Sequence, residues 1–287
     1  MSEYKLSICT IAKDEGPYLL EWLEFHKLVG VEHFYFYDNE STDCTKEILE
    51  FYINSREVTY HYWPGGLGAH NSAVEDCRNK YGHQSEWIAL LDLDEFLFSP
   101  KTDNLKSVLD EYKEFPAVAV NWLTFGSSGH DKKPQGLQIE NFIKRAAKRN
   151  HRNRVVKLVY QPSKVNSIHP HKAEPVEGTV VTENREPYLN NGDNRTIQHS
   201  SQKFRINHYI TRSQEERLNK PRWRAFKATM ERFQKLEREC NEIEDFTIQR
   251  FAPTLKLNIQ QAKLYISNFK LQEIKKELKY VTTNGLF

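Results

Sequence analysis

Short apolar segments alternate with helix-patterned segments through the first hundred residues, and this alternation constrains the fold more than any other feature. Strands are expected at residues 6–11, 31–37, 57–63 and 87–91, and helices at 16–29, at about 43–52 and after the turn Pro64-Gly65-Gly66. Alternation at this spacing predicts a parallel, doubly wound sheet with right-handed connections. The loops after the strands then meet at one edge, so Thr10–Glu15, Asp38–Asp43 and Asp92–Glu95 should lie together.

The segment WIALLDLDEFLF, residues 87–98, carries the strongest chemical signal. Its first five residues read as a strand that is covered on both faces. Because side chains alternate along a strand, Asp92 and Asp94 point to the same side. An Asp-x-Asp is common by chance in a chain with 28% charged residues, but two carboxylates at a strand end are typical of a site for a hard divalent cation.

The pattern loosens after Pro100. Strands are expected at 117–125, 154–160 and 204–210, with a flexible loop at 126–129, a basic helix from about Glu140 and a loop-rich stretch at 161–203. Ser213 and Glu216 match a capping box, and helices are expected at 222–239 and 262–280. We therefore predict an α/β domain at residues 1–211 and a helical extension at 212–287 that packs on it.

Composition narrows the cellular setting. The four cysteines form no C-x-x-C pair, no run approaches about eighteen apolar residues, and the first residues lack a signal-peptide pattern. A cytoplasmic protein is therefore expected. The basic segment 144–157 could be a solvated helix face, a contact for an anionic acceptor, or a contact for an anionic membrane surface. Nucleic acid is disfavoured, because the net charge is only +2 and aromatic residues are not interleaved.

Several segments, read in order, resemble a known family. TIAKDEGPYLLEWLEFH, YDNESTDCT, WIALLDLDEF, NWLTFGSSGH and INHY are similar to glycosyltransferase family 92 and to related family 2-like glycosyltransferases, over roughly residues 5–215. The resemblance implies a GT-A fold, which is Rossmann-like, with a mainly parallel central sheet and helices on both faces. It also implies a nucleotide-sugar donor and a divalent metal, Mn²⁺ or Mg²⁺.

The resemblance assigns donor contacts to the strand-end loops. Asp94 is the expected direct metal ligand. Asp92 is expected to support the metal site, by contacting the ribose or a metal-bound water. Asp38 would pair with the base or ribose, although capping of the next helix is an alternative role. Glu95 is either structural or part of the site. Further donor contacts are expected at Thr10, Ala12, Glu15 and Arg78.

A late histidine is expected as a third metal ligand, since a neutral imidazole suits manganese. His208 is preferred because Asn207-His208-Tyr209, followed by Lys220-Pro221, resembles an element in which the histidine binds metal and the lysine reaches the pyrophosphate. His171 and His169 are the alternatives. His70 stands where relatives often have glutamine, which leaves the identity of the sugar open.

An inverting transferase needs a carboxylate base near the acceptor hydroxyl. Glu140 and Asp131 are the candidates, and either could instead cap a helix or be solvated. The expected function is metal-dependent transfer of a sugar from a UDP-sugar to a saccharide or glycoconjugate, in polysaccharide synthesis, with possible peripheral docking on the inner face of a membrane. The alternative is an inactive protein of the same fold that binds a nucleotide sugar or glycan.

Overall fold

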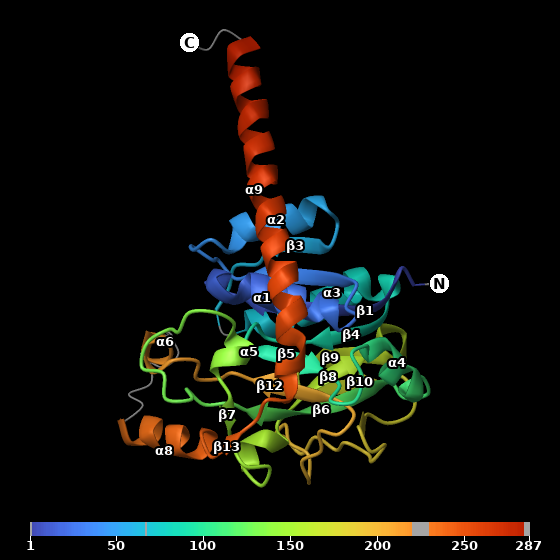
Figure 1. Ribbon diagram of the computed structural model, residues 1–287. Coiled ribbons are helices and arrows are strands. Elements are labelled where there is room, and N and C mark those ends of the chain that lie inside the picture. The colour runs from blue at the N-terminus through green and yellow to red at the C-terminus, as the bar shows by residue number, and fades with distance from the viewer. Residues whose placement is uncertain (1, 67, 220–229, 284–287) are drawn as a thin grey trace.

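The computed structural model describes residues 2–66, 68–219 and 230–283, and its central element is a mixed sheet (Figure 1). In the described residues this sheet has nine strands, in the order β3-β2-β1-β4-β8-β6-β12-β5, with β11 beside β6. Their bounds are Val58–Tyr62, His33–Asp38, Tyr4–Ala12, Ser85–Leu90, Val156–Tyr160, Ala117–Thr124, Arg205–His208 and Glu95–Phe98, with β11 at Val181–Thr182.

Most neighbouring strands are parallel. The four strands β3, β2, β1 and β4 run in the same direction, and β12 and β11 run parallel to β6. The strand β8 is antiparallel to both β4 and β6, and β5 is antiparallel to β12. The predicted α/β class with a mainly parallel GT-A sheet is confirmed. The reversed β8 is the feature that the sequence pattern does not predict.

Side chains alternate between two apolar layers, one on each face of the sheet. In β2, Phe34 and Phe36 enter one layer, and Tyr35 and Tyr37 enter the other. The first layer is covered by α1 (Gly16–Leu28), α2 (Thr45–Asn54), α4 (Leu105–Leu109) and the start of α9 (Ala252–Thr283). The second is covered by α3 (Ala69–Tyr81) and the hairpin of β9 (Val165–His169) and β10 (Lys172–Pro175). Helices therefore lie on both faces.

The loops after β1 and β2 are joined directly at the edge of the sheet. The Gly16 amide donates to Asp43 at 2.8 Å, and the Thr42 amide donates to Asp14 at 2.7 Å. A Cβ at position 16 would lie 2.7 Å from the Cys44 sulfur, so glycine permits this close approach. These contacts fix the loop that follows β1.

The basic helix predicted from Glu140 is wrong. A single turn, α5 (Gln138–Asn141), is followed by the short strand β7 (Lys144–Arg145) and a 3-10 turn at His151–Arg154. The strand β7 pairs with β13 (Ile243–Glu244). The segment has no apolar periodicity to support a helix, and its buried Arg145 instead bonds Asp245 at 2.6 Å.

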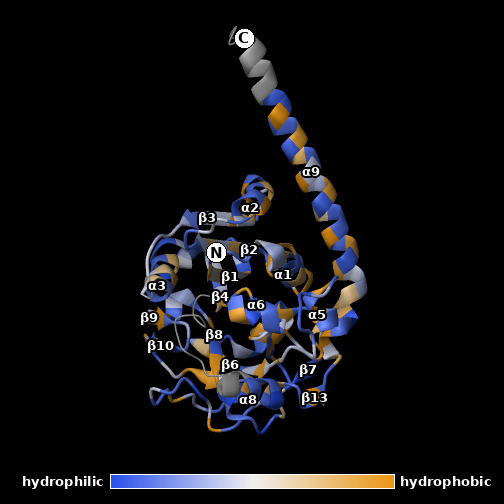
Figure 2. Ribbon diagram, turned by 90° about the vertical axis from the view of Figure 1, so that its left-hand side faces the viewer, coloured by the Kyte–Doolittle hydropathy of each residue, from blue (hydrophilic) through white to orange (hydrophobic). Residues whose placement is uncertain are grey.

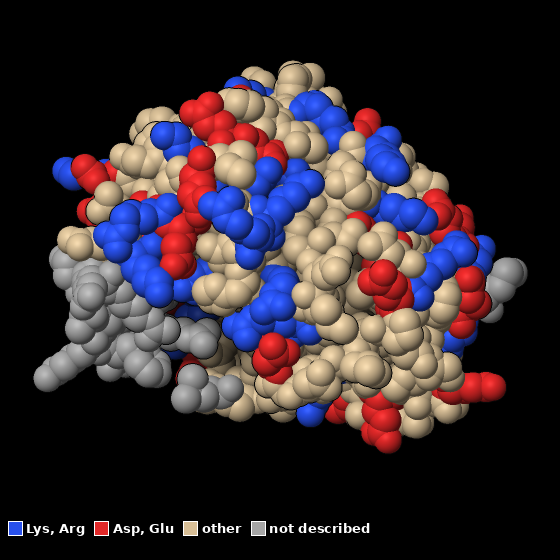
Figure 3. All heavy atoms as spheres, turned by 90° about the horizontal axis from the view of Figure 1, so that it is seen from below, with Lys and Arg blue, Asp and Glu red and all other residues tan. Residues whose placement is uncertain are grey.

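Cations of the segment 144–157 have acidic partners from the C-terminal part of the chain. Arg149 pairs with Glu242, and Arg152 pairs with Glu239. Both acids come from the end of α8 (Met230–Cys240) and the turn after it. On the face of the molecule seen from below, Lys and Arg side chains are interspersed with Asp and Glu (Figure 3). The segment is therefore not a uniformly cationic surface.

The remaining helices largely follow the predicted pattern. The capping box is confirmed: the Glu216 carboxylate accepts from the Ser213 amide and hydroxyl at the start of α6 (Gln214–Asn219). The helix predicted at 222–239 is represented by α8, and its first residues, with Trp223 and Phe226, lie outside the described residues. The stretch 161–203 is loop-rich as expected, apart from β9, β10 and β11.

The residues after 211 share the main core. Phe251, at the end of a 3-10 turn (Thr247–Phe251), packs edge-on against Phe25, with ring centroids 5.4 Å apart. The helix α9 then passes α1 and α2, where Tyr265 stacks on Phe51, and extends beyond the body (Figures 1 and 2). None of the helices in the described ranges is long and apolar enough to cross a membrane.

Phe251→Ala should lower the free energy of unfolding by about 3–5 kcal/mol, because it removes a ring from the shared core. Phe246→Ala is the matched control, since Phe246 is 52% exposed, and its effect should stay within about 0.5 kcal/mol. Urea denaturation of both variants measures the difference. Equal effects would contradict the shared core.

Candidate active site at the carboxyl ends of the strands

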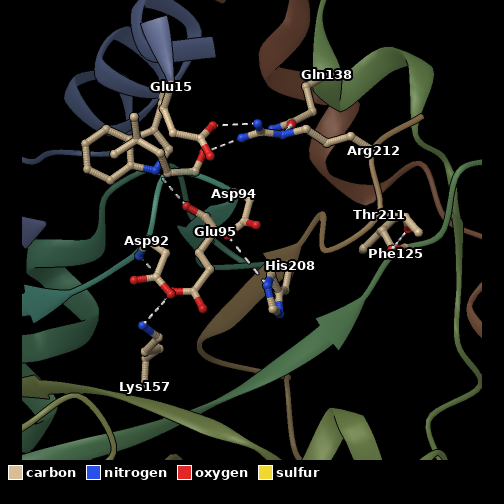
Figure 4. Close-up of polar contacts among 12 residues, drawn as sticks. Glu15, Asp92, Asp94, Glu95, Phe125, Gln138, Lys157, His208, Thr211 and Arg212 are labelled. Atoms are coloured by element: carbon tan, nitrogen blue, oxygen red, sulfur yellow. Dashed lines mark hydrogen bonds and ion pairs between the residues drawn. The ribbon is translucent and has the colours of Figure 1, made fainter. Parts of the chain in front are cut away.

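Carboxylates gather where β4 ends and β5 begins, and a buried lysine from β8 joins them (Figure 4). The Lys157 Nζ lies 2.9 Å from Asp92 Oδ2 and 3.5 Å from Glu95 Oε2. The Glu95 Oε2 also accepts from the Asp92 amide at 3.0 Å. Because β8 runs antiparallel to β4, its first residues lie at the edge where β4 ends, which brings Lys157 to the Asp-x-Asp motif.

The ionisation of these groups differs sharply. Burial acts to raise the pKa of Asp92, but the Lys157 ammonium, followed by His70, holds it well below its usual range. Burial raises the pKa of Glu95 well above its usual range, although Lys157 opposes this. Burial acts to lower the pKa of Lys157, and Asp92 and Glu95 outweigh it. An ionised Asp92–Lys157 pair beside a neutral Glu95 is therefore favoured.

Asp94 faces a histidine from a different strand. The Asp94 Oδ1 lies 3.6 Å from Nε2 of His208, the last residue of β12. The His208 ring packs against Trp122, with centroids 4.2 Å apart. The structure thus brings together the predicted metal ligands Asp94 and His208.

Arg212 forms a second charged centre beside Asp94 (Figure 4). Its guanidinium donates to Glu15 at 2.5 Å, to Gln138 at 2.7 Å and to the Leu93 carbonyl at 3.3 Å. Burial acts to lower the pKa of Arg212, but Glu15 and then Asp94 raise it above its usual range. The arginine connects the loop after β1 with the Asp-x-Asp loop and with α5.

The other predicted donor residues lie at the same edge. The Thr10 hydroxyl is buried and has no hydrogen-bond partner in the part of the chain that the structure describes. The Ala12 carbonyl accepts from the Asn39 amide at 2.8 Å. Asp38 is buried and accepts from the Ser41 amide and the Tyr60 hydroxyl, at 2.9 and 2.8 Å. These bonds fix the loop after β2. The alternative role, capping of the next helix, falls instead to Asp43, which accepts from the Thr45 amide at 2.9 Å at the start of α2.

Arg78 lies away from this edge. It pairs with Glu75 within α3, at 2.5 Å. His70, in the first turn of the same helix, approaches Asp92 at 3.4 Å. Eight residues separate the two positions, which is about 12 Å along the helix axis. The structure therefore places His70, rather than Arg78, beside the motif.

The two candidate bases differ in their surroundings. The Glu140 carboxylate pairs with Lys256 of α9 at 2.6 Å. Asp131 is exposed, and its carbonyl accepts from the Glu215 amide at the start of α6. The predicted pyrophosphate contact Lys220 lies outside the described residues. The roles of all three residues stay predictions.

The alternative histidines lie near the same lysine. Burial, followed by Lys157, lowers the pKa of His171 to about 4, so its ring is neutral at pH 7. Its Nδ1 lies 2.6 Å from the Val156 carbonyl and must donate, which leaves Nε2 unprotonated. Burial also lowers the pKa of His169.

Metal-ligating groups are present but do not form a complete cage. Within residues 2–66, 68–219 and 230–283, no three His, Cys, Asp or Glu side chains are placed to hold one ion. Asp94 and His208 supply an oxygen and a nitrogen ligand, a set that suits Mn²⁺. Asp92 is paired with Lys157. The residues present therefore fit a metal that takes its remaining ligands from another molecule.

Three residues of this site are not predicted from the sequence. Lys157 and Arg212 look like ordinary cations in the chain, and their positions depend on the reversed β8 and on the turn after β12. His70 is visible in the sequence only as a departure from the glutamine of relatives. A lysine inside the apolar run RVVKLVY is the one available signal for Lys157, because a buried lysine needs a partner.

The fold is of the GT-A class, and the sequence comparison gives the family. The model of glycosyltransferase family 92 matches residues 3–259. This chain belongs to glycosyltransferase family 92.

The relatives are distant and longer. A family 92 protein from Oryza sativa subsp. japonica is 29% identical over 171 residues, covering 58% of this chain and 29% of that protein. The galactan beta-1,4-galactosyltransferase GALS2 of Arabidopsis thaliana is 24% identical over 173 residues, covering 55% and 33%. This chain thus spans about a third of these relatives' length. The solved structure of S. aureus TarS is 14% identical, with a TM-score of 0.38, covering 55% of this chain and 47% of that chain.

Glu21→Gln should flatten the pH dependence of stability. Burial raises the pKa of Glu21 to about 7, although it accepts from the Gln138 and Ile139 amides. The folded state therefore holds this proton more tightly, and stability falls by about 3 kcal/mol as the pH rises from about 4.5 through 7. Glutamine mimics the neutral acid. Urea denaturation at pH 5 and 7.5 measures the change, and an equal fall in both proteins would contradict it.

Proposed function

We propose that this protein is a metal-dependent glycosyltransferase that moves a sugar from a UDP-sugar to a saccharide or glycoconjugate acceptor with inversion. The observation that carries the proposal is the Asp94–His208 pair, 3.6 Å apart at the carboxyl ends of the strands. Ligands collect at this edge in open α/β sheets. Family membership supports the reaction class.

Asp94 and His208 would hold the metal, Mn²⁺ or Mg²⁺. When bound, such an ion supplies positive charge that stabilises a departing nucleoside diphosphate. The chain itself orients both ligands: the Asp94 carbonyl accepts from the Tyr209 amide at 2.8 Å, and Trp122 packs on the imidazole. These contacts hold the two ligands in place before any donor arrives.

The donor would lie along the loops after β1 and β2. The unpaired Thr10 hydroxyl and the backbone near Ala12 support a contact with the base or ribose. Arg212 adds fixed positive charge next to Asp94, and it also holds Glu15. A hexosyl donor is supported by the galactosyltransferase name of the Arabidopsis relatives. Lys220 remains the proposed pyrophosphate contact.

An in-line displacement requires a carboxylate that removes the proton from the acceptor hydroxyl. The Glu140 carboxylate is engaged in an ion pair with Lys256 at 2.6 Å. The exposed position of Asp131, in the loop beside α6, supports it as the base. The acceptor would then approach from the side of this loop.

An inactive protein of the same fold that binds a nucleotide sugar or glycan is the second candidate. It is favoured by one observation, the pairing of Asp92 with Lys157, which removes a carboxylate from the motif. Such a protein would bind UDP whether or not Mn²⁺ is present.

The proposed transferase would act in the cytoplasm, at the inner face of a membrane, in the synthesis of a polysaccharide.

Asp94→Asn and His208→Ala should each lower Mn²⁺-dependent hydrolysis or transfer of UDP-sugars by at least about 100-fold, because each removes a metal ligand. Asp103→Asn is the matched control, since this exposed carboxylate pairs with Arg250 away from the site. A screen of UDP-sugars with released UDP as the readout measures the effect. Near-normal turnover in Asp94→Asn would refute the proposed site.

A further inference from the structure

Lys157 is the most unusual residue of the site, because a lysine is rarely enclosed in a central strand. Its side chain is 2% exposed, and it belongs to β8, the strand between β4 and β6. The partly exposed Asp92 is its ion-pair partner at 2.9 Å, and the fully buried Glu95 lies 3.5 Å from the same ammonium. The cost of burying a charge is offset only by such partners.

The two carboxylates of the Asp-x-Asp motif have different partners. Asp92 has one oxygen 2.9 Å from the Lys157 ammonium and the other 3.4 Å from His70. Asp94 instead faces the imidazole of His208. A divalent cation on Asp92 would stand close to a fixed ammonium, and like charges at such a short separation repel strongly. Asp94 also lies near a cation, Arg212, but that guanidinium donates to Glu15 at 2.5 Å, and the Glu15 carboxylate offsets its charge.

We propose that Lys157 is a positioning residue that withholds Asp92 from the metal, so that Asp94 and His208 are the chain's metal ligands. Stable metal binding then depends on the diphosphate of the nucleotide. The proposal rests on the proposed function, since it concerns the metal of that reaction. It also changes the role of Asp92, which becomes the anionic partner of a fixed cation.

The charges support this division of the motif. The Asp92–Lys157 pair is neutral as a unit, and so is the Glu15–Arg212 pair near Asp94. The Asp94 carboxylate therefore carries the negative charge that a cation beside His208 would meet. One carboxylate and one imidazole hold a divalent ion weakly compared with three or four protein ligands. A diphosphate would add the missing oxygen ligands and negative charge. Bound UDP should therefore raise the affinity for the metal, and bound metal should raise the affinity for UDP by the same factor.

The test is a titration of the protein with Mn²⁺, with and without UDP. Electron paramagnetic resonance measures the concentration of free Mn²⁺ at each step. In the wild-type protein, UDP should tighten Mn²⁺ binding at least about tenfold. Asp92→Asn should leave the Mn²⁺ affinity measured with UDP within about threefold, whereas Asp94→Asn should weaken it by about 10–100-fold or more.

Removal of the lysine should increase metal binding, an effect that a folding defect cannot imitate. In Lys157→Met, Asp92 is released, and Mn²⁺ should bind without UDP at least about tenfold more tightly than in the wild type. The double variant Asp92→Asn/Lys157→Met should return to the wild-type affinity. Lys157→Arg, which keeps the charge, should not show the gain. If Lys157→Met does not fold, Glu95→Gln/Lys157→Met replaces it, since glutamine stays neutral at this buried position when the lysine is absent.

Two kinds of failure are distinguishable. If Mn²⁺ does not bind the wild-type protein even with UDP, the proposed metal-dependent function fails. If Mn²⁺ binds with UDP, but Asp92→Asn weakens it as much as Asp94→Asn, the inference about Lys157 alone fails. It also fails if the folded Lys157→Met protein binds Mn²⁺ no more tightly than the wild type.

Discussion

The ion pair between Lys157 and Asp92 is the interaction on which the geometry of the site depends. The buried ammonium, which β8 carries, fixes the first carboxylate of the Asp-x-Asp motif and also lies 3.5 Å from Glu95. Glu95 in turn accepts from the Asp92 amide, which closes the turn between β4 and β5. The same turn carries Asp94, whose carboxylate lies 3.6 Å from His208. One buried cation thus sets the orientation of two neighbouring acids.

Arg212 holds the opposite side of the same turn. It bonds the Leu93 carbonyl, Glu15 and Gln138, so three segments that are distant in sequence converge on one guanidinium. A planar group with several fixed donors suits such a junction. Asp94 lies between the two cationic centres (Figure 4). The site is therefore organised by charges that belong to the chain, before a metal or donor binds.

The sequence predicts the first hundred residues well, because local periodicity determines them. The strands, the helices α1 to α3 and the common edge of the strand-end loops follow from apolar patterning. The pairing of Asp94 with His208 is also anticipated, since it depends on a strand end. Lys157 and His70 could not be placed, because their contacts depend on the reversed strand β8 and on the entry of α3. The helix predicted after Glu140 is wrong for a similar reason, since a contact distant in sequence decides the local structure. Arg145 is buried by its ion pair with Asp245 and not by a periodic apolar face.

A crystal structure with UDP and Mn²⁺ tests the central claim most directly, because anomalous scattering locates manganese independently of the protein model. We expect a single manganese peak within bonding distance of Asp94 and His208 Nε2, with diphosphate oxygens completing the coordination. The Asp92–Lys157 pair should be intact in the same crystal. A manganese ion that bridges Asp92 and Asp94, or one bound away from His208, would contradict the account.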